Sequence, residues 1–403
     1  MMSLRQFSLR TLCRMLGAAC FALSLTAALN AQTNVVYVES NVSNPLHNSI
    51  LGFSNDGLGN LTPLTGSPYL TQGTGWAPKL GDGLALQQDD DQQIVINSSG
   101  TYLYAVNGRS NTVSEFSIKA KGGLTLVGTP VASGGTQPAS IGLLEGVLSD
   151  GGSLLVVVNK DSDPTQLTQK NPNIVSISVT KDGIMTPNAA SKIVYPAGTS
   201  PSQVTVATGN LIMIDEFMAT PSQIAVYRLH SNGTFAFLTS VPVPPGNMLF
   251  LGIVRSPVAD YIFAALPLEG MVAAYSYVPG TGLMTLASIV ATPGELPCWL
   301  AISADGTRLY SGDTQSSSIS VYDVSNPSAP TFLQQLFLSN GVGNGQPWNV
   351  KVDPTGKFLY AITGVGLHAI NIQPDGTLLE LATPTLLNVP SNTYPYGLAT
   401  LLK

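Results

Sequence analysis

The chain has 403 residues, of which 23 are acidic and 17 are basic, so its formal charge at pH 7 is −6. This acidic balance argues against nucleic acid and anionic lipid as partners, because both repel a negatively charged surface. Only 10% of the residues are charged, whereas Gly and Pro number 40 and 28. Such a composition lacks the Glu/Lys/Ala-rich periodic segments that surface helices need, and it favours a turn-rich all-β protein.

The first 31 residues have the pattern of an export signal. Three arginines precede an apolar run that begins at Leu16 and ends in small residues before Gln32. A retained membrane anchor is the alternative, but small and polar residues interrupt the run. We therefore expect residues 1–31 to be removed as a signal peptide, and residues 32–403 to form one exported domain, periplasmic or extracellular.

Removal of the signal changes the charge and the cysteine content. The mature part keeps 14 basic residues against 23 acidic ones, so its formal charge falls to −9. Cys13 and Cys20 leave with the signal and Cys298 alone remains, so the mature chain cannot form an intramolecular disulfide. No later segment offers ~18 consecutive apolar residues, and we expect no membrane span after processing.

Seven short apolar runs recur along the mature chain. Corresponding residues of successive runs are 47 to 67 positions apart. Two further segments follow each run, and one apolar segment precedes every run but the first, with a seventh such segment at the end of the chain, which makes four strand types repeated seven times. The runs begin at Val35, Tyr102, Leu154, Leu211, Tyr261, Arg308 and Phe358.

These runs are continuous rather than alternating, so both faces of each sheet must be covered. Four-stranded antiparallel sheets packed face to face around an axis meet this requirement, and we predict an all-β, seven-bladed β-propeller. The mature chain starts at the second strand type and ends on the first, "YPYGLATLL". We therefore expect the C-terminal strand to complete the first blade. A right-handed β-helix is the main structural alternative, but its coils are usually shorter and lack this offset.

Several stretches resemble a known family. "GTYLYAVNGRSNTVSEFSIKAKGGLTLVG", "ISADGTRLYSGDTQSSSISVYDV" and "VVYVESN" are similar to the lactonase-type seven-bladed propellers, which include a bacterial 6-phosphogluconolactonase and the fungal carboxymuconate-lactonising enzyme. "LYAVNGRSNTV" also resembles the Tyr-Val-Thr-Asn repeat of surface-protein propellers. The resemblance covers essentially all of the mature chain. It implies the propeller fold, a small-molecule ligand and no cofactor.

The enzymes of that family resemble one another in carrying His and Arg where the first-type strands start. The corresponding segments here begin at Gln137, Ser200, Leu296 and Gln346, and none holds His or Arg at those positions. Whether the chain is an enzyme is therefore left open. The main hypothesis is a monomer that binds a small or carbohydrate-like ligand, or another cell-surface component, at the channel mouth. The alternative is a lactone hydrolase or cyclase that uses other residues.

Aromatic residues are the candidates for ligand binding. Trp76, Trp299 and Trp348 all fall in segments expected at the channel mouth, and Tyr396 takes an equivalent place in the last blade. Rings at a mouth can stack on a sugar ring, although they can equally pack between blades. Arg109, in the loop "GRSN", is the mature arginine that we expect near the mouth.

Carboxylates are the candidates for catalysis. We single out Glu145, expected on an innermost strand, and Asp215, at the end of a second-type strand. Asp215 and Glu216 are adjacent and point to opposite sides of an extended strand, which disfavours them as a catalytic pair. The acidic run at 89–91 offers oxygen ligands for a cation, but it lacks the spacing of a calcium loop, so we predict no metal site.

Overall fold

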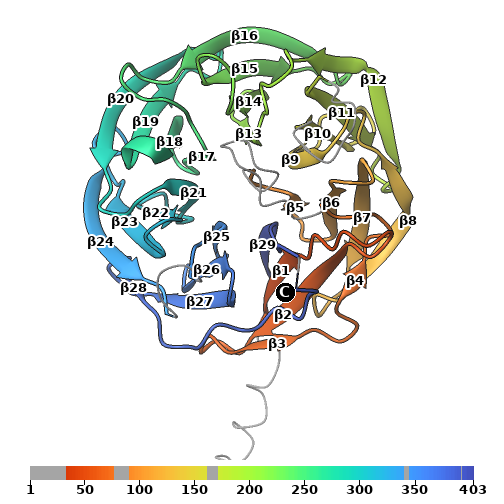
Figure 1. The fold of residues 1–403 in the computed structure, drawn as a ribbon. Coiled ribbons are helices and arrows are strands. Elements are labelled where there is room, and N and C mark those ends of the chain that lie inside the picture. Colours follow the sequence, from red (N-terminus) through yellow and green to blue (C-terminus); the bar gives the residue numbers. More distant parts are fainter. Residues whose placement is uncertain (1–32, 77–89, 161–170, 340–344, 392) are drawn as a thin grey trace, which may run out of the picture.

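The computed structural model describes residues 33–76, 90–160, 171–339, 345–391 and 393–403. The predicted signal peptide lies outside these ranges. Seven antiparallel sheets surround a central axis (Figure 1), and six of them have four strands. The first blade has five strands, because the short β4 pairs with β2 beside β3. The predicted seven-bladed propeller is therefore confirmed.

Each blade contributes one strand of each type. The innermost strands are β29 (Leu398–Leu402), β5 (Ile94–Ile96), β9 (Pro138–Leu144), β13 (Gln203–Ala207), β17 (Ile253–Arg255), β21 (Pro297–Ile302) and β25 (Asn349–Val352). The second strands are β1 (Asn34–Glu39), β6 (Tyr102–Asn107), β10 (Ser153–Asn159), β14 (Leu211–Glu216), β18 (Tyr261–Leu266), β22 (Arg308–Asp313) and β26 (Phe358–Thr363).

The third and fourth strands lie farther from the axis. The third strands are β2 (Ser49–Asn55), β7 (Thr112–Ile118), β11 (Asn173–Val179), β15 (Gln223–Leu229), β19 (Met271–Tyr277), β23 (Ser318–Asp323) and β27 (Gly366–Ile372). The fourth are β3 (Leu61–Pro63) with β4 (Tyr69–Leu70), β8 (Leu124–Ala132), β12 (Met185–Val194), β16 (Phe235–Pro242), β20 (Met284–Ala291), β24 (Thr331–Phe337) and β28 (Leu378–Leu379).

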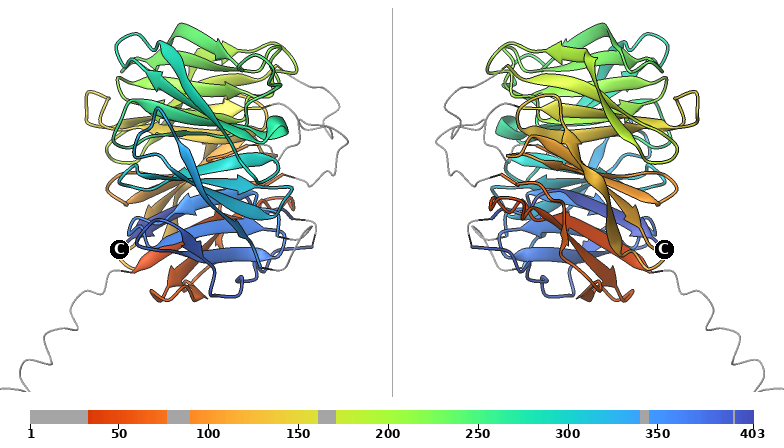
Figure 2. Two further views of the ribbon diagram at one scale, coloured as in Figure 1. Left: turned by 90° about the vertical axis from the view of Figure 1, so that its left-hand side faces the viewer. Right: turned by 90° about the vertical axis from the view of Figure 1, so that its right-hand side faces the viewer.

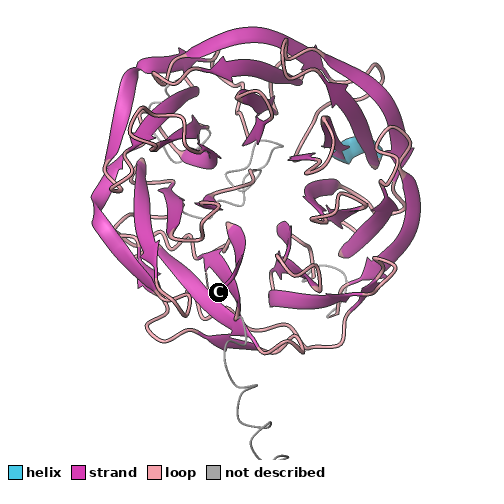
Figure 3. Ribbon diagram, turned by 180° about the vertical axis from the view of Figure 1, so that it is seen from behind, coloured by secondary structure: helices cyan, strands magenta, loops and turns pink. Residues whose placement is uncertain are grey.

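Strands dominate the described residues (Figure 3), and one short 3₁₀ helix, Pro267–Glu269, follows β18. No helix in these parts of the chain is long and apolar enough to cross a membrane.

The core lies between neighbouring blades. In β1 every residue is buried, and alternate side chains face opposite neighbours. Val35 and Tyr37 pack with blade 2, whereas Val36 and Val38 pack with blade 7. This arrangement explains why the sequence run is continuous, since each face of the sheet contributes to a different hydrophobic cluster.

The last strand closes the ring. β29 pairs antiparallel with β1, with Ala399 opposite Tyr37 and Thr400 opposite Val36. The backbone N–H of Lys403 donates to the carbonyl of Thr33 at 2.9 Å. The first blade is thus built from both ends of the described chain, as predicted from the strand order.

We name the two faces of the ring by the innermost strands. The entry face is the end at which these strands begin, and the exit face is the end at which they finish. The C-terminus follows β29 and therefore lies at the exit face, as the side views show (Figure 2).

Tyrosines at one position of the repeat link successive blades. The hydroxyl of Tyr37 donates to the Gly122 carbonyl of blade 2 at 2.6 Å, and that of Tyr310 donates to the Gly376 carbonyl of blade 7 at 3.1 Å. Both glycines have positive φ, 82° and 86°, in the turn before the fourth strand. In both cases a Tyr of one blade therefore forms a hydrogen bond with a Gly turn of the next blade.

We predict that Tyr310→Phe lowers the free energy of unfolding by about 1 to 2 kcal/mol, because the Gly376 carbonyl loses its buried partner. Tyr104→Phe is the matched control. Tyr104 occupies the same place in blade 2, and its hydroxyl makes no hydrogen bond within the described part of the chain. Urea unfolding measures both variants. Equal losses in the two variants would contradict the prediction.

Candidate functional site

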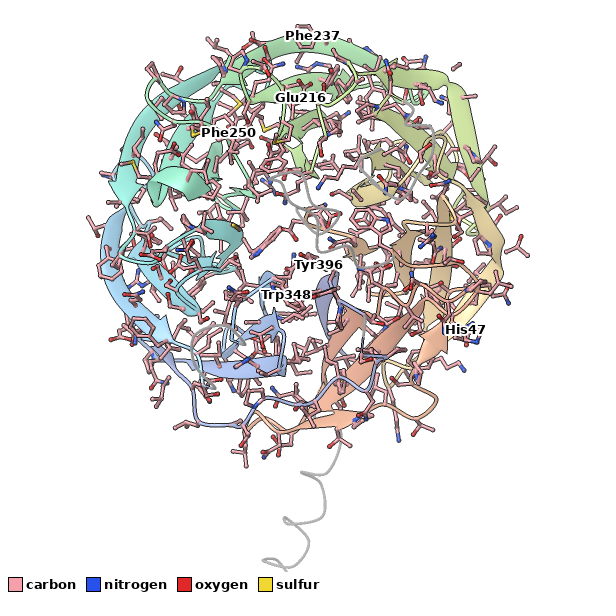
Figure 4. The ribbon with its side chains drawn as sticks, in the orientation of Figure 1. His47, Glu216, Phe237, Phe250, Trp348 and Tyr396 are labelled. Carbon is pink, nitrogen blue, oxygen red and sulfur yellow. The ribbon has the colours of Figure 1, made fainter. Side chains whose placement is uncertain are left out.

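Four aromatic rings gather at the entry face, beside the axis. Trp299 lies on β21, Trp348 immediately precedes β25, and Tyr394 and Tyr396 precede β29. Trp348 and Tyr396 are stacked, with centroids 6.2 Å apart and planes at 9°. Figure 4 shows both beside the channel. Trp299 meets Tyr396 edge to face at 6.2 Å, and Tyr394 lies 4.9 Å from Trp348.

These contacts decide which rings a ligand can reach. Trp299 and Tyr396 are 3% and 2% exposed and belong to the hydrophobic core between the last blades. Trp348 and Tyr394 are half-buried. The accessible surface of the cluster therefore belongs to the Trp348 and Tyr394 rings, whereas the two buried rings support them.

Trp76 and Arg109 lie together, next to blade 2. Trp76 is 8% exposed and packs so closely on Gly108 that a Cβ there would lie 1.2 Å from its indole nitrogen. Arg109 is exposed, and its backbone N–H donates to the Thr74 carbonyl at 3.1 Å. Within the described ranges no ring contact joins Trp76 to the Trp348 cluster. These two predicted residues are thus separate from the other three.

Asp215 is fully buried where β14 ends at the entry face. Ser202 Oγ donates to its carboxylate at 2.8 Å, and the backbone N–H of Gly252 in blade 5 donates at 3.2 Å. Burial raises the pKa of Asp215 to about 7, against the effect of these bonds and of the nearby Lys160 charge. A carboxyl with this pKa can exchange a proton near neutral pH.

The neighbouring Glu216 lies on the opposite face of the same sheet. Its carboxylate accepts a hydrogen bond from Gln223 Nε2 on β15 at 2.7 Å, and burial raises its pKa. The two acids therefore have different partners, as expected for consecutive residues of a strand. Figure 4 shows where Glu216 lies within blade 4.

Glu145 is at the opposite end of the molecule from Asp215. It immediately follows β9, is exposed, and accepts hydrogen bonds from the Ser98 N–H at 3.0 Å and the Ser98 hydroxyl at 3.1 Å. These hydrogen bonds join Glu145 to the turn between β5 and β6 of blade 2, at the exit face. The structure does not bring the two carboxylates that we singled out together.

Two further buried carboxylates lie at ends of second strands, and the sequence interpretation missed them. Glu39, fully buried, accepts a hydrogen bond from Asn48 Nδ2 at 2.7 Å. Asp313 accepts from the hydroxyls of Ser311, Ser318 and Ser320 at 2.9, 3.2 and 2.6 Å. Aligning the residues after each apolar run would have found both. Burial raises the pKa of Glu39 to about 8 and that of Asp313 to about 7.

The acidic run at 89–91 does not form a cluster that fits a metal. Asp89 lies outside the described residues, Asp90 contacts the Gln93 side chain, and Asp91 points into the central channel toward Asn349 and Gln203. Across the described ranges, no three His, Cys, Asp or Glu side chains are placed to hold an ion.

We predict that stability falls as pH rises toward 8, because Glu39 keeps its proton in the folded chain up to a pKa of about 8 but loses it near 4.5 when unfolded. Between these values the folded state binds more protons, so raising the pH favours unfolding. Glu39→Gln keeps an acceptor for Asn48 and removes the titration. Its urea midpoint should change less between pH 6 and pH 9 than that of the wild type.

Glu145→Gln, at an exposed site, is the control for this measurement. A Glu39→Gln protein with the full pH dependence of the wild type would show that Glu39 is not the group responsible.

Comparisons with known proteins agree with this architecture. The family model described as "Lactonase, 7-bladed beta-propeller" matches residues 33–194 and 222–364. Among solved structures, a Lactobacillus plantarum protein is 16% identical, with a TM-score of 0.69, over 92% of this chain and 99% of its own. A periplasmic gluconolactonase of Pseudomonas aeruginosa is 16% identical, with a TM-score of 0.66, over 92% and 99%.

At such identities the two structures show likeness of fold alone. A search of curated proteins found no match. The family model covers well over half of the sequence, and the chain therefore belongs to the lactonase family of seven-bladed β-propellers.

Proposed function

We propose that this protein is an exported propeller that binds a small, carbohydrate-like ligand at the entry face of its channel. The observation that carries the proposal is the aromatic cluster, in which half-buried Trp348 and Tyr394 are held by buried Tyr396 and Trp299. A partly exposed aromatic ring held in place by neighbouring rings suits the apolar face of a sugar or sugar lactone. The relative named as a periplasmic gluconolactonase supports both an exported location and a sugar-derived ligand.

Binding is favoured over catalysis because the acids and the histidine near the entry face are buried and hydrogen-bonded to neighbouring groups. Asp215 and Glu216 are 0% and 5% exposed, and each is bonded to neighbouring strands or loops. His368 is also buried, and its Nδ1 lies 2.5 Å from Glu380. Lactone hydrolysis requires a base that reaches water beside the ring carbonyl, and these side chains do not present one to solvent.

Lactone hydrolysis is the second candidate, and one observation favours it. The pKa of Asp215 is raised to about 7, which is suitable for a general base at neutral pH. In this alternative, binding of a ligand at Trp348 would be accompanied by a movement of the strands and loops that cover Asp215, so that Asp215 becomes exposed.

We predict that Trp348→Ala weakens binding of a saccharide or sugar lactone by roughly tenfold or more, because it removes the stacking surface. Isothermal titration with glucose, gluconolactone and short oligosaccharides measures the affinity. Phe337→Ala, which removes an exposed ring on the outer strand β24, is the matched control and should bind as the wild type does.

Two results would contradict this proposal. One is the absence of binding to every member of the panel. The other is lactone opening that exceeds a heat-treated control and is abolished by Asp215→Asn, which would make the protein an enzyme.

Export is tested separately. We predict that the protein recovered outside the cytoplasm begins near Gln32, because the apolar run ends in small residues just before it. N-terminal sequencing of the exported chain reads the cleavage site directly. Recovery of the intact N-terminus in a membrane fraction would instead indicate a retained anchor.

A further inference from the structure

The innermost strands enclose a central cavity of about 240 Å³. All seven blades contribute to its lining, including Leu398 of blade 1, Val95 of blade 2 and Leu143 of blade 3. This volume is below the ~300 to 1,000 Å³ of sites for drug-sized molecules, so only a small ligand fits.

Residues 90–93 cross the entry end of this cavity. Asp91 donates its backbone N–H to the Ser202 carbonyl of blade 4 at 3.3 Å, and it accepts from Asn349 Nδ2 of blade 7 at 2.9 Å. Gln92 Nε2 donates to the Ile141 carbonyl of blade 3 at 2.7 Å. The segment leads to β5 near the axis in Figure 1. It therefore separates the cavity from the Trp348 cluster.

Solvent reaches the cavity from the exit face. Leu398 and Val350, at the starts of their strands, are buried. Farther along the strands, Arg255 is half-buried and Lys351 is exposed. The two cations therefore stand in the part of the cavity that water can enter.

The charges inside the cavity are unbalanced. Asp91 is the acidic residue of the lining, and its carboxylate is already bonded to Asn349 and approached by Gln203 Nε2 at 3.4 Å. Burial raises the pKa of Asp91, and the charge of Lys351 opposes that effect. The side chain of Arg255 makes no hydrogen bond or ion pair with any other described residue. The lining thus holds two cations and one carboxylate.

Arg255 differs in this respect from two other arginines. Arg228 donates to the carbonyls of Gly209, Pro279 and Gly280, at 2.6 to 2.9 Å. Arg308 donates to the Asp375 carbonyl at 2.9 Å and pairs with Asp323 at 3.4 Å. These two guanidinium groups join blades or strands. The unpaired donors of Arg255 instead point to a ligand that the cavity can take from outside.

We propose that the exit half of the channel is a binding site for a small hydroxylated carboxylate. Its anionic group lies between Arg255 and Lys351, and its hydroxyls donate to Asp91. Arg255 and Lys351 line the same narrow opening from different blades, so their two positive charges favour an anion over a neutral molecule. This site does not depend on the function proposed for the entry face.

The test is isothermal titration of the full mature chain with sodium gluconate at low ionic strength. We expect Arg255→Gln and Lys351→Gln each to weaken gluconate binding by roughly tenfold, and the double variant to abolish it. Lys181→Gln, an exposed lysine outside the cavity, is the matched control and should retain the wild-type affinity. Arg255→Lys keeps the charge and should restore part of the affinity.

Thermal melting shows that the variants are folded. Since the Arg255 side chain has no partner among the described residues, Arg255→Gln should melt as the wild type does without ligand, and gluconate should raise its melting temperature less than that of the wild type. Trp348→Ala should leave gluconate binding unchanged, so this site and the entry-face site can fail independently.

Three outcomes would overturn the proposal. These are no gluconate binding by the wild type, unchanged binding by both cavity variants, or inorganic phosphate binding more tightly than gluconate through the same two cations. The last result would identify the site as one for phosphate rather than for a carboxylate.

Discussion

The whole ring depends on second strands that are apolar on both faces. A strand such as β1 places Val35 and Tyr37 against one neighbour and Val36 and Val38 against the other, so no blade can bury its core alone. Burial then requires a closed circle, and closure requires that the first blade be completed by the last strand. Hydrophobic packing between blades therefore accounts for the closed ring and for the pairing of β29 with β1.

Because the second strands are apolar on both faces, polar and charged side chains lie at the strand ends and near the axis. A carboxylate at the end of a second strand, such as Glu39, Asp215 or Asp313, is still between blades, so it becomes buried and bonds to hydroxyls and amides of adjacent strands and loops. Burial by the fold is sufficient to raise the pKa of such a carboxylate, so the raised pKa alone does not indicate catalysis. This is why the family resemblance and the buried acids together do not amount to a lactonase mechanism.

Much of the fold could be predicted from the sequence, because strand type and phase are local patterns. The period and the strand order predicted seven blades and the pairing of β29 with β1, which the structure confirms. The candidate site was less accessible. Trp299, Trp348 and Tyr396 could be placed at one face from their positions in the repeat, but their mutual stacking depends on side chains from three blades. Glu145 was expected on an innermost strand, whereas β9 ends one residue earlier and the side chain holds Ser98 instead.

The crossing of the channel by residues 90–93 could not be predicted at all, since it rests on bonds to blades 3, 4 and 7 that no local pattern encodes. Yet this crossing gives the two ends of the channel different chemistry. On its entry side the wall is aromatic, and its exit side holds two of the few basic residues of an acidic chain. The overall negative charge of the chain repels anions from the outer surface. An anion therefore enters the channel only because the positive charges of Arg255 and Lys351 attract it locally. A neutral ring suits the first environment and a small anion suits the second, and the segment between them keeps the two preferences apart.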